Sequence, residues 1–94
     1  MAIKVSESLA ATGSTEALVL KRGFVSVQGT WVGTINVEAD PTGSGSWSNI
    51  TDLTGAALAF TGNFNLAIDN GGPVKTRVKF TRTSGTAVVV LIGE

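Results

Sequence analysis

Apolar and polar residues alternate along most of this chain, and the alternation is clearest between Trp31 and Ala39. In the stretch WVGTINVEA, every second residue from Trp31 onwards shares one face, and the residues between them share the other. A period of two is the pattern of a β-strand with one buried face. We therefore predict a strand here, with Trp31, Ile35 and Val37 directed into a core.

The same pattern predicts strands along the rest of the chain, separated by short turns rich in Gly, Ser, Thr and Asn. The predicted strands are 2–6, 16–21, 24–29, 31–39, 47–53, two short strands within 54–72, 74–83 and 86–94. Pro41, Gly43 and Gly45 predict a loop at 40–46, and Ser84-Gly85 predicts a tight turn between neighbouring antiparallel strands. Together these elements favour a single all-β domain over residues 1–94, an antiparallel β-sandwich of about eight short strands resembling a jelly roll.

The stretch TAVVVLIGE at 86–94 is apolar almost without a break. An apolar run of this length predicts a strand that is covered on both faces, either central in its sheet or packed against another subunit. Val88, Val90 and Ile92 are therefore candidate protein-interface residues, for contact with a second copy or with a partner protein.

A row of basic residues lies on the strand 74–83. Lys75, Arg77 and Lys79 alternate, so they share one face at a spacing of about 7 Å, and Arg82 follows just beyond. One interpretation is a solvated face paired with acids across the sheet, such as Glu38. Another is an interface for an acidic protein surface. Nucleic-acid binding is a third, although the row lacks interleaved aromatic residues.

The two tryptophans lie on either side of the loop DPTGSGS. Strand parity places Trp31 with the core residues. Trp47 begins the next strand and is a candidate partner-contact aromatic. The alternative is that both rings stack on sugars, as in a carbohydrate- or receptor-binding module.

The composition restricts the chemistry that is open to this chain. Its 94 residues contain no Cys, His or Tyr, so disulfides, thiol catalysis and histidine-based catalysis or metal binding are excluded. Asp40, Asp52 and Asp69 follow predicted strands, and aspartates in turns usually accept local backbone hydrogen bonds. We expect no enzyme activity, no catalytic residue, no metal, no cofactor and no small-molecule substrate.

Charge and hydropathy point to an assembly. Charged residues make up 15% of the chain and the net charge is zero, so neither nucleic acid nor a membrane is expected as a partner. A surface with few charges is poorly protected against association, which favours a homo-oligomer. The N-terminal stretch MAIKVSESLAATG has no long apolar run, so we expect synthesis in a cytoplasm without a secretory signal or membrane span.

Two stretches resemble small virion proteins of tailed bacteriophages. GTWVGTINVEADPTGSGSWSNI is similar to their Trp-containing strand followed by a glycine-rich turn and a second Trp, and GGPVKTRVKFTRTSGTAVVVLIGE is similar to their usual ending. The resemblance covers about 24–49 and 70–93, more than half of the chain. The turn DPTGSGS departs from the usual DGGTT, and Phe80 or Thr81 stands where Tyr is common.

This resemblance implies a structural β-sandwich of a phage virion, made in the host bacterium. The expected function is a capsid decoration or cement protein on the outer surface of the shell, with the major capsid protein or other virion proteins as partners. The alternatives are a carbohydrate- or receptor-binding module of a head fibre or tail, and a structural component of the tail or neck.

Overall fold

The computed structural model describes residues 3–51 and 56–94, and within these ranges the chain forms six strands in one antiparallel sheet. The strands are β1 (Ile3–Leu9), β2 (Gly13–Ser14), β3 (Leu18–Asp40), β4 (Ser48–Asn49), β5 (Ala59–Phe60) and β6 (Phe64–Gly93). The prediction of an all-β antiparallel fold is confirmed. The structure has six strands where about eight short ones were expected, because β3 and β6 each contain several of the predicted strands without a break.

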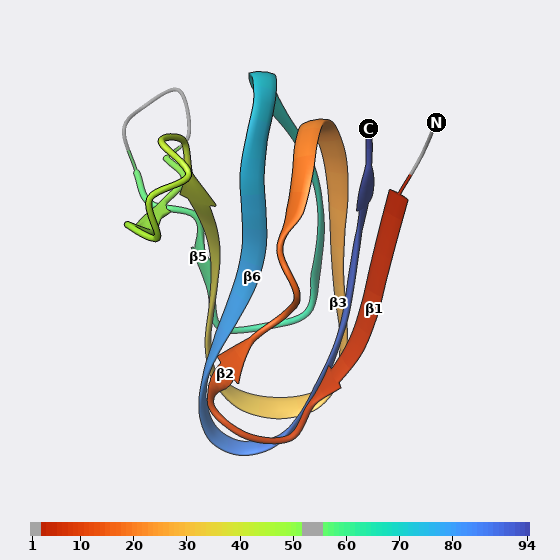
Figure 1. Ribbon diagram of the computed structural model, residues 1–94. Helices are drawn as coiled ribbons and strands as arrows, with labels where there is room; N and C mark the ends of the chain where they lie inside the picture. The colour runs from red at the N-terminus through yellow and green to blue at the C-terminus, as the bar shows by residue number, and fades with distance from the viewer. Residues whose placement is uncertain (1–2, 52–55) are drawn as a thin grey trace.

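The sheet doubles over on itself along its two long strands. Residues 23–30 of β3 pair with residues 86–93 of β6, whereas residues 33–40 of β3 pair with residues 75–82. Figure 1 shows the two paired regions on opposite sides of the molecule, with the chain bending between them at one end. We call the region that contains β1 and residues 86–93 the first layer, and the region that contains residues 33–40 the second layer.

Each layer has a fixed order of neighbours. In the first layer, β1 pairs with residues 86–93 of β6, which pair with residues 23–30 of β3, and residues 22–27 also pair with residues 64–69. In the second layer, β2 and residues 18–20 pair with residues 74–80 of β6, and β4 and β5 pair with residues 35–39 of β3. The final strand is thus paired on both edges, which confirms the prediction of a central strand.

The bend between the layers corrects one prediction. Ser84-Gly85 does not form a tight hairpin turn, because residues 84 and 85 stay paired with Val32 and Trp31 of β3 while both chains bend together. A register shift follows at Gly33. Gly85 has a φ of 79°, and a Cβ atom at this position would overlap the backbone oxygen of Thr30. Glycine is therefore required where the two strands bend side by side.

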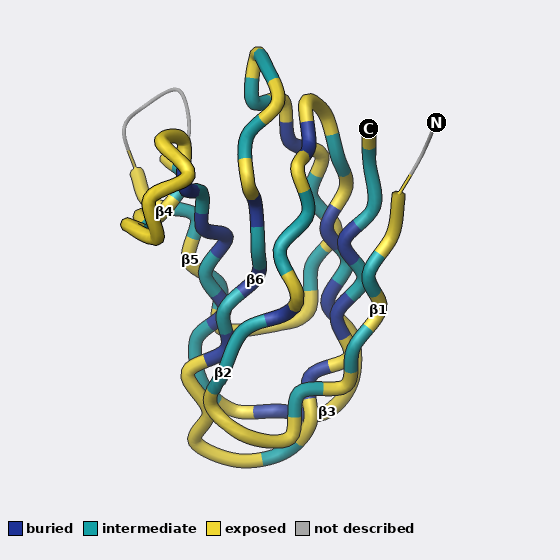
Figure 2. The backbone as a smooth tube through the Cα atoms, in the orientation of Figure 1, coloured by how far each residue is buried: buried dark blue, intermediate teal, exposed yellow. Residues whose placement is uncertain are grey.

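A single apolar core lies between the layers, as the distribution of buried residues in Figure 2 shows. The predicted inward residues Trp31, Ile35 and Val37 are all buried, which confirms the parity of this strand. The Trp31 and Phe80 rings meet edge to face, with centroids 5.5 Å apart, an arrangement that aromatic pairs prefer. The buried apolar residues of the core are Leu20, Val25, Val27, Trp31, Ile35, Val37, Ile68, Val78, Phe80, Ala87, Val89 and Leu91.

The strands at the edge of the second layer are shorter than predicted. The expected strand 47–53 is reduced to β4, with Asp52 and Leu53 outside the described residues, and the expected strand near residue 60 is reduced to β5. The backbone hydrogen bonds of Val37 explain why both strands are short. Its carbonyl accepts from the N–H of Ile50, and its N–H donates to the carbonyl of Leu58. Two segments share the edge of β3 at this point, so neither forms a long ladder.

Candidate protein-binding site

The outer face of the first layer carries an apolar patch. Val88, Val90 and Ile92 alternate with the buried residues of β6 and point away from the core, and Val88 is 38% exposed. Phe24 of β3 lies directly opposite Ile92 and is 42% exposed. We call the surface made by Phe24, Val88, Val90 and Ile92 the apolar face.

The apolar face is bordered by small polar residues. Antiparallel pairing places Ser6 and Ser26 on either side of Val90, and Ser8 and Gln28 on either side of Val88. In these rows of neighbours the one charged residue is Lys4, which lies opposite Ile92. Burying a surface of this kind costs little desolvation free energy, because almost no charge has to be removed from water.

Phe24 was not a candidate from the sequence, although the pattern contained the signal. Val25 and Val27 alternate with Phe24 and Ser26 in the predicted strand 24–29, and both are fully buried. Parity therefore directs Phe24 outward, next to the final strand. The sequence could not show that residues 23–30 and 86–93 are neighbours, since that pairing joins segments far apart in the chain.

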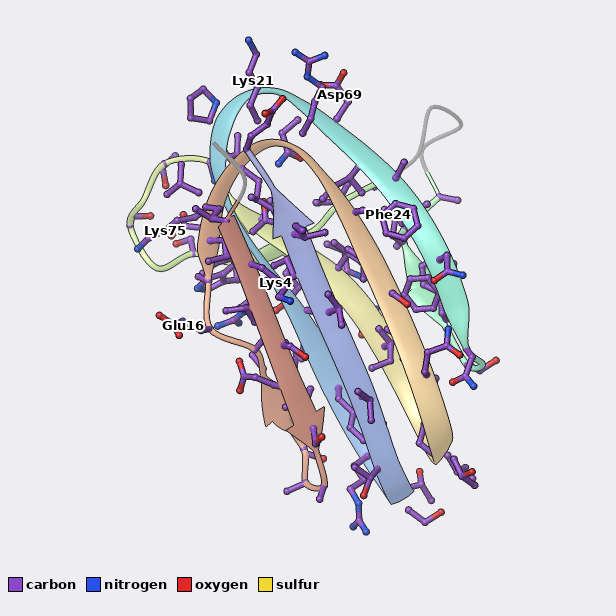
Figure 3. The ribbon with its side chains drawn as sticks, turned by 90° about the vertical axis from the view of Figure 1, so that its right-hand side faces the viewer. Lys4, Glu16, Lys21, Phe24, Asp69 and Lys75 are labelled. Atoms are coloured by element: carbon purple, nitrogen blue, oxygen red, sulfur yellow. The ribbon has the colours of Figure 1, made fainter. Side chains whose placement is uncertain are left out.

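The basic row lies on the outer face of the second layer. Lys75 pairs with Asp40 in the second layer, whereas Phe24 pairs with Ile92 in the first. Figure 3 shows the two residues well apart, near the left and right margins of the view. Arg77 Nε donates a hydrogen bond of 2.9 Å to Glu38 Oε1, as the paired-acid interpretation predicts. Lys75 lies opposite Asp40, and Lys79 lies opposite Asn36.

Arg82 is separate from this row. It is exposed at the bend between the layers, where its Nε donates to the carbonyl of Gly85 and its backbone N–H donates to Thr12 Oγ1. These contacts hold the bend together. The structure therefore does not bring Arg82 together with Lys75, Arg77 and Lys79 on one surface.

Trp47 is half-buried and stacks on Arg77, whose guanidinium carbon lies 4.1 Å from the ring centroid. This cation–π contact covers one face of the ring. Trp31 is buried, and its Nε1 donates a 2.7 Å hydrogen bond to Asn63 Oδ1. The two tryptophans therefore lie in different environments and do not form a joint platform.

The described aspartates accept local hydrogen bonds, as expected for turns. Asp69 Oδ1 accepts from the N–H of Gly71 at 2.9 Å, and Asp40 Oδ2 accepts from the N–H of Gly45 at 2.8 Å. The hydrogen bond from Gly45 lowers the pKa of the Asp40 carboxyl below its ordinary value; partial desolvation opposes this shift, and weaker hydrogen bonds from the same loop add to it. Asp52 lies outside the described residues.

One apolar pocket of about 370 Å³ opens beside the first residues of β6. Its lining residues are Ile50, Thr51, Leu58, Leu66, Ala67, Ile68, Asp69 and Asn70. Asp69 and Asn70 are already engaged, since Asp69 accepts from Gly71 and Asn70 Nδ2 donates to the carbonyl of Leu20. The pocket therefore offers apolar contact and few free polar groups.

Comparisons with known proteins give a distant structural likeness. No protein-family model matches the sequence, and no curated protein matches it. Among solved structures, the chain is similar to the Drosophila melanogaster CENP-C cupin domain, with a TM-score of 0.48 and 10% sequence identity. The alignment covers 96% of this chain and 58% of that chain. A likeness this weak carries no inference about function.

Residues 3–51 and 56–94 contain no group of three or more acidic residues arranged to hold a metal ion. The same part of the chain contains no helix with the length and hydropathy needed to cross a membrane.

Proposed function

We propose that this chain is a structural protein of a tailed-phage virion, a capsid decoration or cement protein that binds the outer surface of the shell. The observation that carries the proposal is the apolar face, on which Phe24 and Val88 are exposed and Val90 and Ile92 are partly exposed among the described residues. The proposal adds a location to the resemblance of residues 24–49 and 70–93 to phage virion proteins. It assigns binding and no catalysis.

The apolar face is suited to a modest contact that is repeated many times. Fully burying one Val, Ile or Phe side chain stabilises by about 1.5–3 kcal/mol, and these four side chains are already partly buried. A contact made by one copy is consequently weak. On a symmetric shell, a copy that bridges two capsid subunits makes two linked contacts. Its overall binding is then stronger than either contact alone, through multivalency.

The basic row supports a secondary role in the same assembly. Arg77 is held by Glu38 and Trp47, so it is less available to a partner than the neighbouring lysines. Lys75 and Lys79 lie on the outer face of the second layer and suit an acidic neighbour. Because the two surfaces point in different directions, one chain can contact two partners at once.

The carbohydrate-binding alternative has less support. It requires two exposed rings, whereas Trp31 is 9% exposed and one face of Trp47 is covered by Arg77. A role in the tail or neck would use the same surfaces. Only the location in the virion separates that role from capsid decoration.

Binding to purified shells tests the proposal. Val88→Ser removes an apolar side chain from the apolar face, and Val19→Ser makes the same change at a residue that is 52% exposed in the second layer. We expect Val88→Ser to reduce the amount of protein bound to undecorated capsids several-fold and Val19→Ser to leave it unchanged. Equal binding of both variants and the wild type would contradict the use of the apolar face.

A further inference from the structure

The edge of β1 is an open β-strand edge. Within residues 3–51 and 56–94, the backbone pairing of β1 is with β6 alone, over seven consecutive residue pairs without a register shift. Figure 3 looks onto this margin of the molecule, with β1 in front. The outward edge of β1 thus presents a row of backbone donors and acceptors that no other described strand uses.

The other strand edges are less suited to pairing with a second chain. β4 and β5 have two residues each, and the edge of the second layer is interrupted between β2 and Leu18. Residues 66–70 line the pocket together with Ile50 and Leu58. Natural proteins usually protect a long edge with proline, a bulge, charged side chains or a covering segment. β1 has neither a proline nor a bulge. Its charged residues are Lys4 and Glu7, and Glu7 Oε2 accepts a hydrogen bond from the backbone N–H of Glu16.

We propose that β1 pairs antiparallel with β1 of a second copy of this chain, with Ser6 on the two-fold axis. The two sheets then continue into one another through a backbone ladder that closes both open edges.

Strand parity and length select this register. Residues opposite each other in an antiparallel pair share one face, so the outward residues Lys4, Ser6 and Ser8 must lie opposite outward residues. An axis at Ser6 meets this condition and pairs all seven residues of β1. An axis at Val5 or at Glu7 pairs only five, and the latter also places two carboxylates directly opposite one another.

The side chains also fit a register centred on Ser6. Ile3, which is 40% exposed, then lies opposite Leu9 of the second copy, so an apolar side chain at the end of the strand gains a partner. Lys4 lies opposite Ser8 and Glu7 lies opposite Val5. No like charges are directly opposite, and the small Ser6 side chains meet on the axis without a clash.

The proposed dimer does not depend on the proposed capsid role, but it has a consequence for it. The two-fold axis is perpendicular to the joined sheet, so both apolar faces lie on the same side. Phe24 and Val88 of both copies would then contact one surface together. The dimer would then offer a shell twice the apolar area of one chain, with no change in the structure of either copy.

Cysteine cross-linking tests the register directly, because the chain has no native cysteine. Directly opposed residues have Cβ atoms about 4.5–5.5 Å apart, close to the separation that a disulfide needs. Under mild oxidation, we expect Ser6→Cys to give a covalent dimer and the matched variants Lys4→Cys and Ser8→Cys to stay uncross-linked when each is alone. An equimolar mixture of Lys4→Cys and Ser8→Cys is expected to cross-link.

Sedimentation of charge variants provides the second measurement. We expect the wild type to sediment as a dimer, and Ser6→Lys and Ser6→Glu each to sediment as folded monomers because like charges meet on the axis. Mixing these two variants should restore a dimer. A wild type that stays monomeric at every concentration, or a dimer that is lost through Val88→Ser and not through Ser6→Lys, would overturn the proposal.

Discussion

The guanidinium of Arg77 lies 4.1 Å from the centre of the Trp47 ring while its Nε donates to Glu38. Arg77 therefore joins the loop after β3 to the outer face of the second layer. In the sequence, Arg77 and Trp47 were candidate contacts for a partner. In the structure they contact each other, which assigns them a role in holding the Pro41–Trp47 segment in place.

Trp47→Ala is expected to lower the free energy of unfolding by about 1 kcal/mol, because it removes the cation–π contact with Arg77 and part of the apolar cover. Urea denaturation of Trp47→Ala, Arg77→Ala and the double variant measures the coupling. We expect a coupling energy of about 0.5–1 kcal/mol. A coupling energy of zero would mean that the two side chains do not interact in solution.

Asn63→Ala is expected to cost about 0.5–1.5 kcal/mol of stability, because the partly buried hydrogen bond from Trp31 Nε1 loses its acceptor. Asn63 also donates to the carbonyl of Gly29, so the same change weakens the bend between the layers. Asn65→Ala, at an exposed position two residues away, is the matched control and should change stability little. Thermal unfolding measures both variants: the midpoint should fall for Asn63→Ala and stay close to the wild-type value for Asn65→Ala.

Gly85→Ala is expected to destabilise the fold much more than Gly43→Ala. Both glycines have positive φ, with values of 79° and 68°, so an alanine is strained at either position. A Cβ atom at Gly85 would also overlap the backbone of Thr30, whereas Gly43 has no atom near its Cβ position. We expect a cost of about 1 kcal/mol for Gly43→Ala and several kcal/mol for Gly85→Ala. Similar unfolding midpoints for the two variants would contradict the described bend.

Asp40 makes stability depend on pH in the acid range. Its pKa in the folded state is lowered from an ordinary value of 3.8, chiefly by the hydrogen bond from Gly45, so its contribution to stability is fully present above that value. The contribution is lost as the pH falls through the lowered pKa. Asp40→Asn should therefore be less stable than the wild type at neutral pH, with a difference that narrows in acid. A difference that stays constant from neutral pH to pH 2 would rule out this linkage.

Local strand patterns could be predicted from the sequence because each depends on a few neighbouring residues. The alternation from Trp31 to Val37 gave the correct buried face, and the apolar run from Ala87 gave a central strand. Pairing between segments that are far apart in the chain could not be predicted from these local patterns. The bend at Gly85 was interpreted as a hairpin turn, because the sequence does not show that Trp31 lies beside it.

The candidate site was predictable to the same degree. Parity directs Val88, Val90 and Ile92 to one face, and the structure places them together on the outer side of the first layer. The same reasoning placed Lys75, Arg77 and Lys79 on one face and named Glu38 as an acid across the sheet. It could not predict that Trp47 returns from the loop to cover Arg77, since a loop has no periodic pattern.

The proposed location on a phage capsid is the central claim, and imaging virions tests it most directly. If the proposal is correct, a cryo-electron microscopy reconstruction of virions that carry this chain shows many copies on the outer surface of the capsid, with Phe24 and Val88 directed toward the shell. Finding only a few copies at the neck or tail, or a capsid-bound chain whose apolar face points to solvent, would contradict the account.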